Sequence, residues 1–300
     1  MKKFFALLLA TMLCLTLVAC GNNEEKPNGD NNDVNPSGNV AVSKDYFEWS
    51  PTNDTQIIGY TELGLKQKEI AIPEDCTSVQ GLENNTTVQY IEFKNPDTVI
   101  LSNTFRNSTS LVSVKLPANI TVLDDSAFNG CTSLKNITIP ENVTEIGSNV
   151  FLDCTSLETV TTNAKLETIG RKSFSNCSAL KSISIPDSVK EIEKSAFENC
   201  SALAELKLGN GLEEIGESAF QKCTSLKTVN VPEGVKTLEI YAFAHCDALE
   251  SIYLPASIEM AEISSLVQTH EIKVFVVEGS YMDGRISELM GEEFYSKQYQ

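Results

Sequence analysis

The chain has 300 residues with 41 acidic and 23 basic side chains, so its formal net charge is −18 at pH 7. A hydrophobic fraction of 41% is ordinary for a globular protein. The excess of acid excludes a nucleic-acid-binding protein, which needs a basic surface to neutralise phosphates. One tryptophan and two histidines leave few of the side chains that enzymes use most.

The first 19 residues have the pattern of a secretory signal peptide. Lys2 and Lys3 precede an apolar run from Phe4 to Val18, which is shorter than the roughly 20 residues that a membrane-spanning helix needs. The run ends in Leu17-Val18-Ala19-Cys20-Gly21, which resembles the bacterial lipobox. The resemblance implies that Cys20 becomes the acylated first residue of the mature protein. The alternative is a plain signal peptide with an incidental cysteine.

Residues 20–45 are predicted to be the lipidated cysteine and a disordered linker. Gly21 to Asp45 contains seven Asn, three Gly and two Pro, a composition that cannot bury enough apolar surface to fold. The cluster Asp30-Asn31-Asn32-Asp33 lacks the alternating ligands, the central Gly and the terminal Glu of an EF-hand loop. We therefore expect no metal site here.

A period of 23 residues organises most of the remaining chain. Three residue types keep this interval without a slip: Phe105, Phe128, Phe151, Phe174, Phe197, Phe220 and Phe243; Cys131, Cys154, Cys177, Cys200, Cys223 and Cys246; and Leu111, Leu134, Leu157, Leu180, Leu203, Leu226 and Leu249. A fixed period of this length is typical of solenoid proteins.

The spacing inside one unit predicts its parts. Ile137 and Ile139 are two apart, so both point to one side of a short strand, and the following Pro140 ends it. Val150, Phe151 and Cys154 are three and four apart, which predicts a short helical or 3₁₀ segment with one apolar side. A single unit cannot bury that side, whereas stacked units share it, giving about ten turns with one strand each in a parallel sheet.

With these columns the chain resembles the BspA-type leucine-rich repeat family of bacterial surface proteins, whose pattern is Leu-x-x-Ile/Val-x-Ile/Leu-Pro, then Val-x-x-Ile-Gly, Ala-Phe and Cys. The match is strong from Phe105 to Ser265, with Asn163 and Gly209 as departures in the proline column. The resemblance implies a mostly β fold within the α/β class, a right-handed leucine-rich-repeat solenoid. It assigns an N-terminal capping hairpin to 46–69, the solenoid to 70–279, with Ile272, Phe275 and Val277 as its last strand, and a C-terminal cap to 280–300.

The cysteine column invites two interpretations that its geometry disfavours. In stacked turns the Cβ vectors run parallel, whereas a disulfide needs Cβ atoms that converge to about 3.8 Å. No pair has the two-to-four-residue spacing of a zinc knuckle. We expect buried free thiols.

The sequence predicts no active site and no cofactor. The carboxylate pairs Asp124-Asp125, Glu213-Glu214 and Glu292-Glu293 are adjacent residues in loops, so their side chains point apart. His245 and His270 have no serine or cysteine placed beside them for activation. We therefore expect a protein that is not an enzyme.

The outward strand positions are the candidate binding site, because solenoids bind ligands along an extended concave face. The predicted ligand-binding residues are Tyr90, Glu92, Lys115, Thr138, Thr161, Ser184, Lys207, Asn230 and Tyr253. A companion column holds Ser113, Asn136, Thr159, Ser182, Glu205, Thr228 and Ser251.

The leading hypothesis is a surface-exposed, lipid-anchored binding or adhesion protein whose partner is an extracellular protein or another cell-surface ligand. Adhesion is what the family resemblance implies. The alternatives are a structural envelope protein without a specific ligand and a glycan-binding lipoprotein. An enzyme acting on glycans would need carboxylates facing each other across a pocket, and the strand columns hold too few acids for one.

Overall fold

The computed structural model describes residues 40–299 except 263, 267, 269 and 291–294, and all of these belong to one compact unit. The predicted signal peptide, Cys20 and most of the linker lie outside the described residues. Between residues 40 and 299, the described helices include none with the length and apolar character to cross a bilayer.

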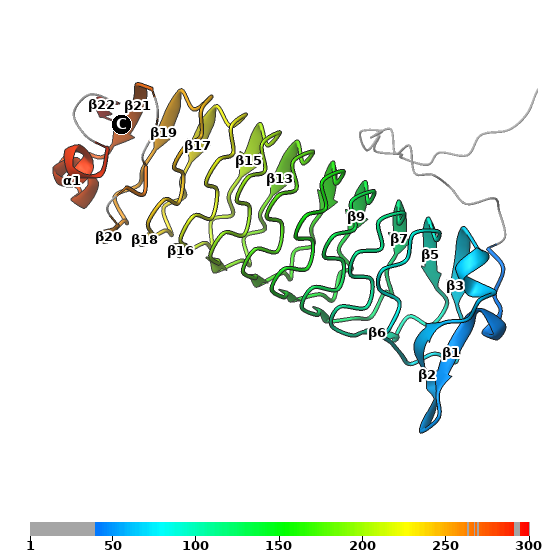
Figure 1. Ribbon diagram of the computed structural model, residues 1–300. Helices are drawn as coiled ribbons and strands as arrows, with labels where there is room; N and C mark the ends of the chain where they lie inside the picture. Colours follow the sequence, from blue (N-terminus) through cyan, green and yellow to red (C-terminus); the bar gives the residue numbers. More distant parts are fainter. Residues whose placement is uncertain (1–39, 263, 267, 269, 291–294, 300) are drawn as a thin grey trace, which may run out of the picture. The chain divides into compact units, whose positions relative to one another are not determined.

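The unit is a mostly β parallel solenoid of ten turns, which confirms the predicted repeat fold. Each turn contributes one main strand, and these strands lie side by side along the upper side of Figure 1. From β5 onward their outer residues are exposed or half-buried, whereas the residue between them points into the core, as the two-residue spacing predicted. The main strands are β3 (Glu69–Ile72), β5 (Tyr90–Phe93), β7 (Ser113–Lys115), β9 (Asn136–Thr138), β11 (Thr159–Thr161), β13 (Ser182–Ser184), β15 (Glu205–Lys207), β17 (Thr228–Asn230), β19 (Ser251–Tyr253) and β21 (Ile272–Val276).

Nearly every turn also contains a second strand, which the sequence analysis did not predict. These strands have two residues, one outward and one buried, and they line the lower side of Figure 1. They are β4 (Ser78–Val79), β6 (Val99–Ile100), β8 (Val122–Leu123), β10 (Glu145–Ile146), β12 (Thr168–Ile169), β14 (Glu191–Ile192), β16 (Glu214–Ile215), β18 (Thr237–Leu238) and β20 (Met260–Ala261). Strands β8 to β20 form one unbroken parallel sheet of seven strands.

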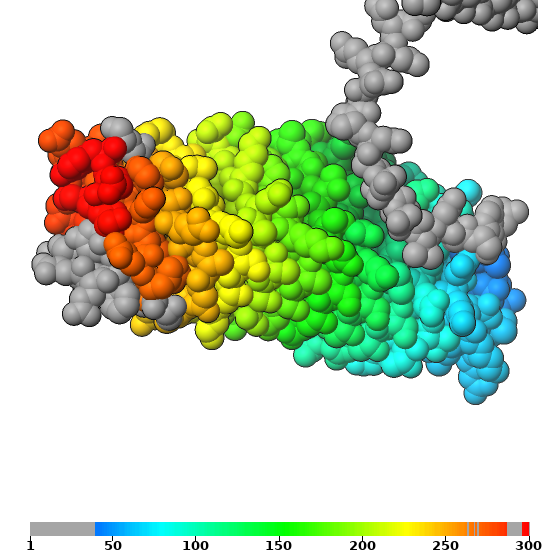
Figure 2. Space-filling model, turned by 90° about the horizontal axis from the view of Figure 1, so that it is seen from above, coloured from blue at the N-terminus to red at the C-terminus, as the bar shows by residue number. Residues whose placement is uncertain are grey.

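The phenylalanine column is the centre of the core. All seven rings are buried, and successive centroids from Phe105 to Phe243 lie 5.1 to 5.5 Å apart with interplanar angles of 21° or less. The backbone joins the same turns, since the N–H of each phenylalanine donates to a carbonyl of the next turn, as from Phe174 to Ala196 at 2.8 Å. Figure 2 shows the resulting order, in which the colours follow the sequence turn by turn.

The segment around each phenylalanine is a run of turns and not the helical or 3₁₀ segment that the spacing predicted. Two residues per unit have positive φ, such as Lys172 (54°) and Asn176 (62°), and these interrupt a helix because the left-handed region reverses the backbone. Most of these positions hold Asn, Asp or Ser, and Asn and Asp are among the residues that best tolerate this conformation. The turns therefore pack the apolar side inward without a helix.

The N-terminal end of the solenoid carries an antiparallel hairpin. Strands β1 (Phe47–Ser50) and β2 (Asn53–Tyr60) pair with each other, and β2 pairs in parallel with β4, so the hairpin forms a four-stranded sheet with the two-residue strands β4 and β6. Two 3₁₀ turns flank it, η1 (Lys44–Tyr46) and η2 (Gly64–Lys66). Val42 forms a bridge with Ala71 at the edge of β3.

The C-terminal end is closed by helix α1 (Tyr281–Met290) and strand β22 (Tyr295–Tyr299), which pairs in parallel with β21. The predicted last strand needs a correction. β21 ends at Val276, and its inward residues are Ile272, Val274 and Val276, because a strand alternates sides at every residue. Phe275 therefore lies on the outward side.

The six cysteines of the 23-residue column are buried free thiols, as predicted. Each Sγ–H donates to the carbonyl oxygen of the phenylalanine in the preceding turn, for example from Cys177 to Phe151 at 3.2 Å. Ser108 uses its hydroxyl in the same way at the start of the column. Burial raises the pKa of Cys200 to about 12, so the reactive thiolate is scarce at neutral pH.

We expect the Phe174→Ala substitution to destabilise the solenoid by about 3 to 5 kcal/mol, because it opens a cavity between two neighbouring rings. Stability in a solenoid is transmitted between nearest neighbours, so the melting transition should also broaden or split. Thermal unfolding followed by circular dichroism measures both effects. The exposed Arg171→Ala is the control, with an expected change of about 0.5 kcal/mol or less. Equal melting curves for the two variants would contradict the assigned core.

The cysteine column should react slowly with iodoacetamide in the native protein and completely after denaturation. Mass spectrometry without reductant should then find six alkylated thiols between Cys131 and Cys246. A bridged pair of neighbouring turns would show that the geometric argument against disulfides is wrong.

Candidate functional site

We use the name strand face for the outward positions of the main strands from β5 to β21. All nine residues predicted for binding lie on it. Three are half-buried, namely Tyr90, Glu92 and Tyr253, and six are exposed, namely Lys115, Thr138, Thr161, Ser184, Lys207 and Asn230. Sheet pairing places neighbours in register, such as Thr138 with Thr161 and Ser184 with Lys207.

The N-terminal end of the strand face is an ion-pair cluster. The Glu92 carboxylate accepts from Lys94 Nζ at 2.7 Å and from Lys115 Nζ at 2.9 Å. The hydrogen bond from Lys94 is the main cause of a lowered pKa for the Glu92 carboxyl. Glu92 and Lys115 therefore neutralise each other, and their main role is to join β5 to β7.

The middle of the strand face is built from short hydroxyl and amide side chains. Thr159 Oγ1 donates a hydrogen bond to Asn136 Oδ1 in the next strand. Thr138, Thr161 and Ser184 are exposed beside them. These side chains are short and uncharged, whereas charged residues flank them at Lys115 and Lys207.

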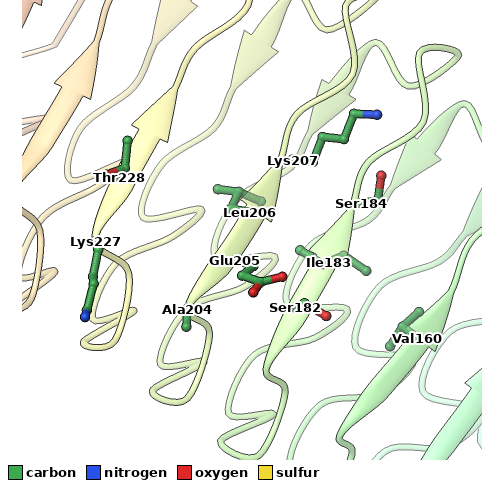
Figure 3. Close-up of a pocket in the computed structure, with 10 residues that line it drawn as sticks. All are labelled: Val160, Ser182, Ile183, Ser184, Ala204, Glu205, Leu206, Lys207, Lys227 and Thr228. Atoms are coloured by element: carbon green, nitrogen blue, oxygen red, sulfur yellow. The ribbon is translucent and has the colours of Figure 1, made fainter. Parts of the chain in front are cut away.

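A shallow hollow of about 610 Å³ lies over β13, β15 and the start of β17. Figure 3 shows that Glu205 and Lys207 of β15 lean toward β13, where Ser182 and Ser184 are their register partners. Neither Glu205 nor Lys207 forms an ion pair with another described residue. The hollow is thus lined by one carboxylate and by the hydroxyls of Ser182 and Ser184 beside the Lys207 ammonium group, with Lys227 and Thr228 on its β17 side.

The hollow exists partly because the main strands do not form one continuous sheet. They divide into β3-β5-β7, β9 to β15, and β17-β19-β21-β22, so β15 and β17 belong to different sheets. Leu206, at an inward position of β15, is half-buried instead of buried and contributes to the floor together with Ile183. In the proline column, the turn that follows β15 has Gly209 instead of proline.

A second hollow of about 540 Å³ lies at the C-terminal end of the strand face. The Tyr253 ring stacks on Phe275 with centroids 4.3 Å apart and an interplanar angle of 7°. His270 and Lys273 also line it, and His270 Nε2 lies 2.6 Å from the Leu249 carbonyl oxygen. The sequence analysis missed Phe275, although the alternation Ile272-x-Val274-x-Val276 was the signal that could have placed it.

The acidic pair Glu213-Glu214 lies close to lysines of the neighbouring turns. Glu213 Oε1 lies 3.5 Å from Lys190 Nζ in the preceding turn, and Glu213 Oε2 lies 3.5 Å from Lys236 Nζ in the following turn. Burial, followed by the charge of Glu239, raises the pKa of Glu214, and Glu292-Glu293 lie outside the described residues. Over the described ranges, no three His, Cys, Asp or Glu side chains come close enough to hold a metal ion.

Comparisons with known proteins agree with this architecture. A family model described as the BspA type leucine-rich repeat region, in six copies, matches residues 63–181 and 167–283. No curated protein matches the chain.

Three solved structures illustrate the likeness. A leucine-rich repeat protein from Bacteroides ovatus is 20% identical, with 87% of this chain and 92% of that one covered and a TM-score of 0.40. A leucine-rich repeat protein from T. pallidum is 25% identical over 75% and 87%, with a TM-score of 0.44. A leucine-rich cell surface protein from Faecalibacterium prausnitzii is 21% identical over 88% and 95%, with a TM-score of 0.30. The family assignment rests on the repeat model.

Proposed function

The chain belongs to the BspA-type leucine-rich repeat family, and we propose that it is a lipid-anchored surface protein that binds an extracellular protein on its strand face. The observation that supports this most directly is the hollow over β13 and β15 with its unpaired Glu205 and Lys207. Interface hot spots form in pockets of this kind, where a partner side chain can be surrounded.

The charge of the strand face supports a binding role. Its outward positions carry three lysines, Lys115, Lys207 and Lys273, against the two glutamates Glu92 and Glu205, whereas the whole chain has a net charge of −18. The acidic excess therefore lies on other surfaces. The charged side chains of the strand face itself thus carry a small positive excess, which favours a partner with a complementary negative surface.

The lipid anchor is supported by Cys20 and the apolar run before it, and adhesion by the family. The proposed role needs no catalytic group. Glu205 lines the first hollow, and Glu250 and Glu271 line the second. A structural envelope protein without a ligand is the principal alternative. A glycan ligand is the second, because hydroxyl and amide side chains line the face.

The binding function can be tested with purified residues 21–300 as bait for host extracellular proteins and bacterial surface glycans. Ser184→Trp should fill the hollow and weaken binding to a captured protein by about tenfold or more. The matched control is Thr168→Trp on β12, at an outward position of the second sheet, and it should bind like the wild type. Capture of glycans alone would favour the second alternative. Equal binding by both variants would remove the strand face as the site.

The anchor predicts that Cys20→Ser yields unprocessed precursor without acyl chains, because the thiol is the acyl acceptor. Fractionation and mass spectrometry of the N-terminus measure this. Normal membrane retention with a normally acylated N-terminus in the variant would contradict the lipoprotein assignment.

A further inference from the structure

The N-terminal end of the described chain has unusually exposed apolar side chains. Leu63 and Leu65, on either side of Gly64, are 47% and 45% exposed, and Val42 is 52% exposed. These three are among only seven large apolar residues that are exposed in the described chain, and all three lie at or next to the N-terminal cap. In Figure 1 the η2 turn lies beside β3, at the end where the described chain begins.

The exposure of the two leucines is built into the cap. Gly64 is buried, and a Cβ atom at this position would lie 2.0 Å from the Tyr46 carbonyl oxygen, so the turn is pressed against η1. Thr61 fastens it, since its N–H donates to Tyr46 O at 3.1 Å and its Oγ1 accepts from Gly64 N–H at 3.2 Å. With the backbone held in this way, Leu63 and Leu65 stay directed to the outside.

Cationic side chains follow the leucines. Lys66 and Lys68 are exposed and form no ion pair within the described ranges, whereas Lys44 pairs with Asp75. Glu62 is the one acidic residue inside this short loop. Leucines with adjacent lysines are the composition that enters the interfacial region of a bilayer, where ammonium groups remain at the headgroups.

The position of the turn along the chain indicates what covers it. The proposed acyl group is on Cys20, and the described chain starts at Val40, so the intervening residues reach at most about 70 Å. Val42 bridges to β3, and Thr61, which precedes the η2 turn, donates its N–H to Tyr46 O, so the exposed leucines lie near the residues where the tether joins the cap. A tether of this length holds the cap near the membrane at an effective concentration in the mM range, at which a weak apolar contact is populated.

We propose that Leu63 and Leu65, with Val42, form a membrane-contacting tip by which the anchored solenoid rests on the lipid surface. This inference depends on the proposed lipid anchor. It gives the N-terminal cap a second role, because the contact restrains the orientation of the strand face relative to the membrane.

The test uses the acylated protein in vesicles of phosphatidylethanolamine and phosphatidylglycerol that contain lipids with brominated acyl chains. Leu65→Cys is labelled with an environment-sensitive dye. The labelling is selective because the native cysteines of the described residues are buried. The control is Met260→Cys, equally exposed in the wild type at 46% but located in the last turns. It carries the same dye, so insertion driven by the dye would appear at both sites.

We expect roughly twofold quenching of the dye at position 65 and little at position 260. Adding Leu63→Ser to the Leu65→Cys protein should reduce the quenching. Acylated, vesicle-bound protein without quenching at position 65, or with equal quenching at both positions, would overturn the membrane tip and leave the anchor intact. Failure of the proposed anchor gives a different result. In that case the Cys20→Ser variant would still be acylated and retained at the membrane.

Discussion

No 23-residue turn of this protein can bury its own apolar side, and the sharing of that side between neighbours is the constraint on which the structure depends. The phenylalanine rings stack at 5.1 to 5.5 Å, close to the spacing of strands in a sheet. One repeat distance therefore satisfies the ring stack and the backbone hydrogen bonds together. Any residue that enlarges one turn disturbs both.

The same constraint separates the inner from the outer residues. Positions inside the stack must repeat, because each meets its own copy in the next turn, and this explains the columns of Phe, Cys and Leu. Outward positions meet solvent and are free to vary. The strand face changes from an ion-pair cluster at Glu92, through hydroxyls, to the stacked rings of Tyr253 and Phe275. Binding specificity can therefore vary along the strand face while the inward residues of the scaffold repeat.

The two ends of the stack are treated differently. At the C-terminal end β22 adds to the last sheet of main strands, whereas at the N-terminal end the hairpin pairs with β4, and of the described residues before β3 only Val42 bridges to that strand. An uncovered edge strand favours aggregation. The proposed contact of Leu63 and Leu65 with the membrane would protect the less covered end.

The sequence by itself determined the 23-residue period, the inward columns, the free thiols and the outward position of the nine candidate residues, because alternation and repetition are local properties. The tertiary structure alone decided three features. The two-residue strands form only when neighbouring turns hydrogen-bond, the left-handed residues replace the expected helical segment, and the break between β15 and β17 opens the hollow beside Glu205 and Lys207. Each of these features depends on how one turn packs and hydrogen-bonds against the next. The sequence of a single 23-residue unit does not determine this packing.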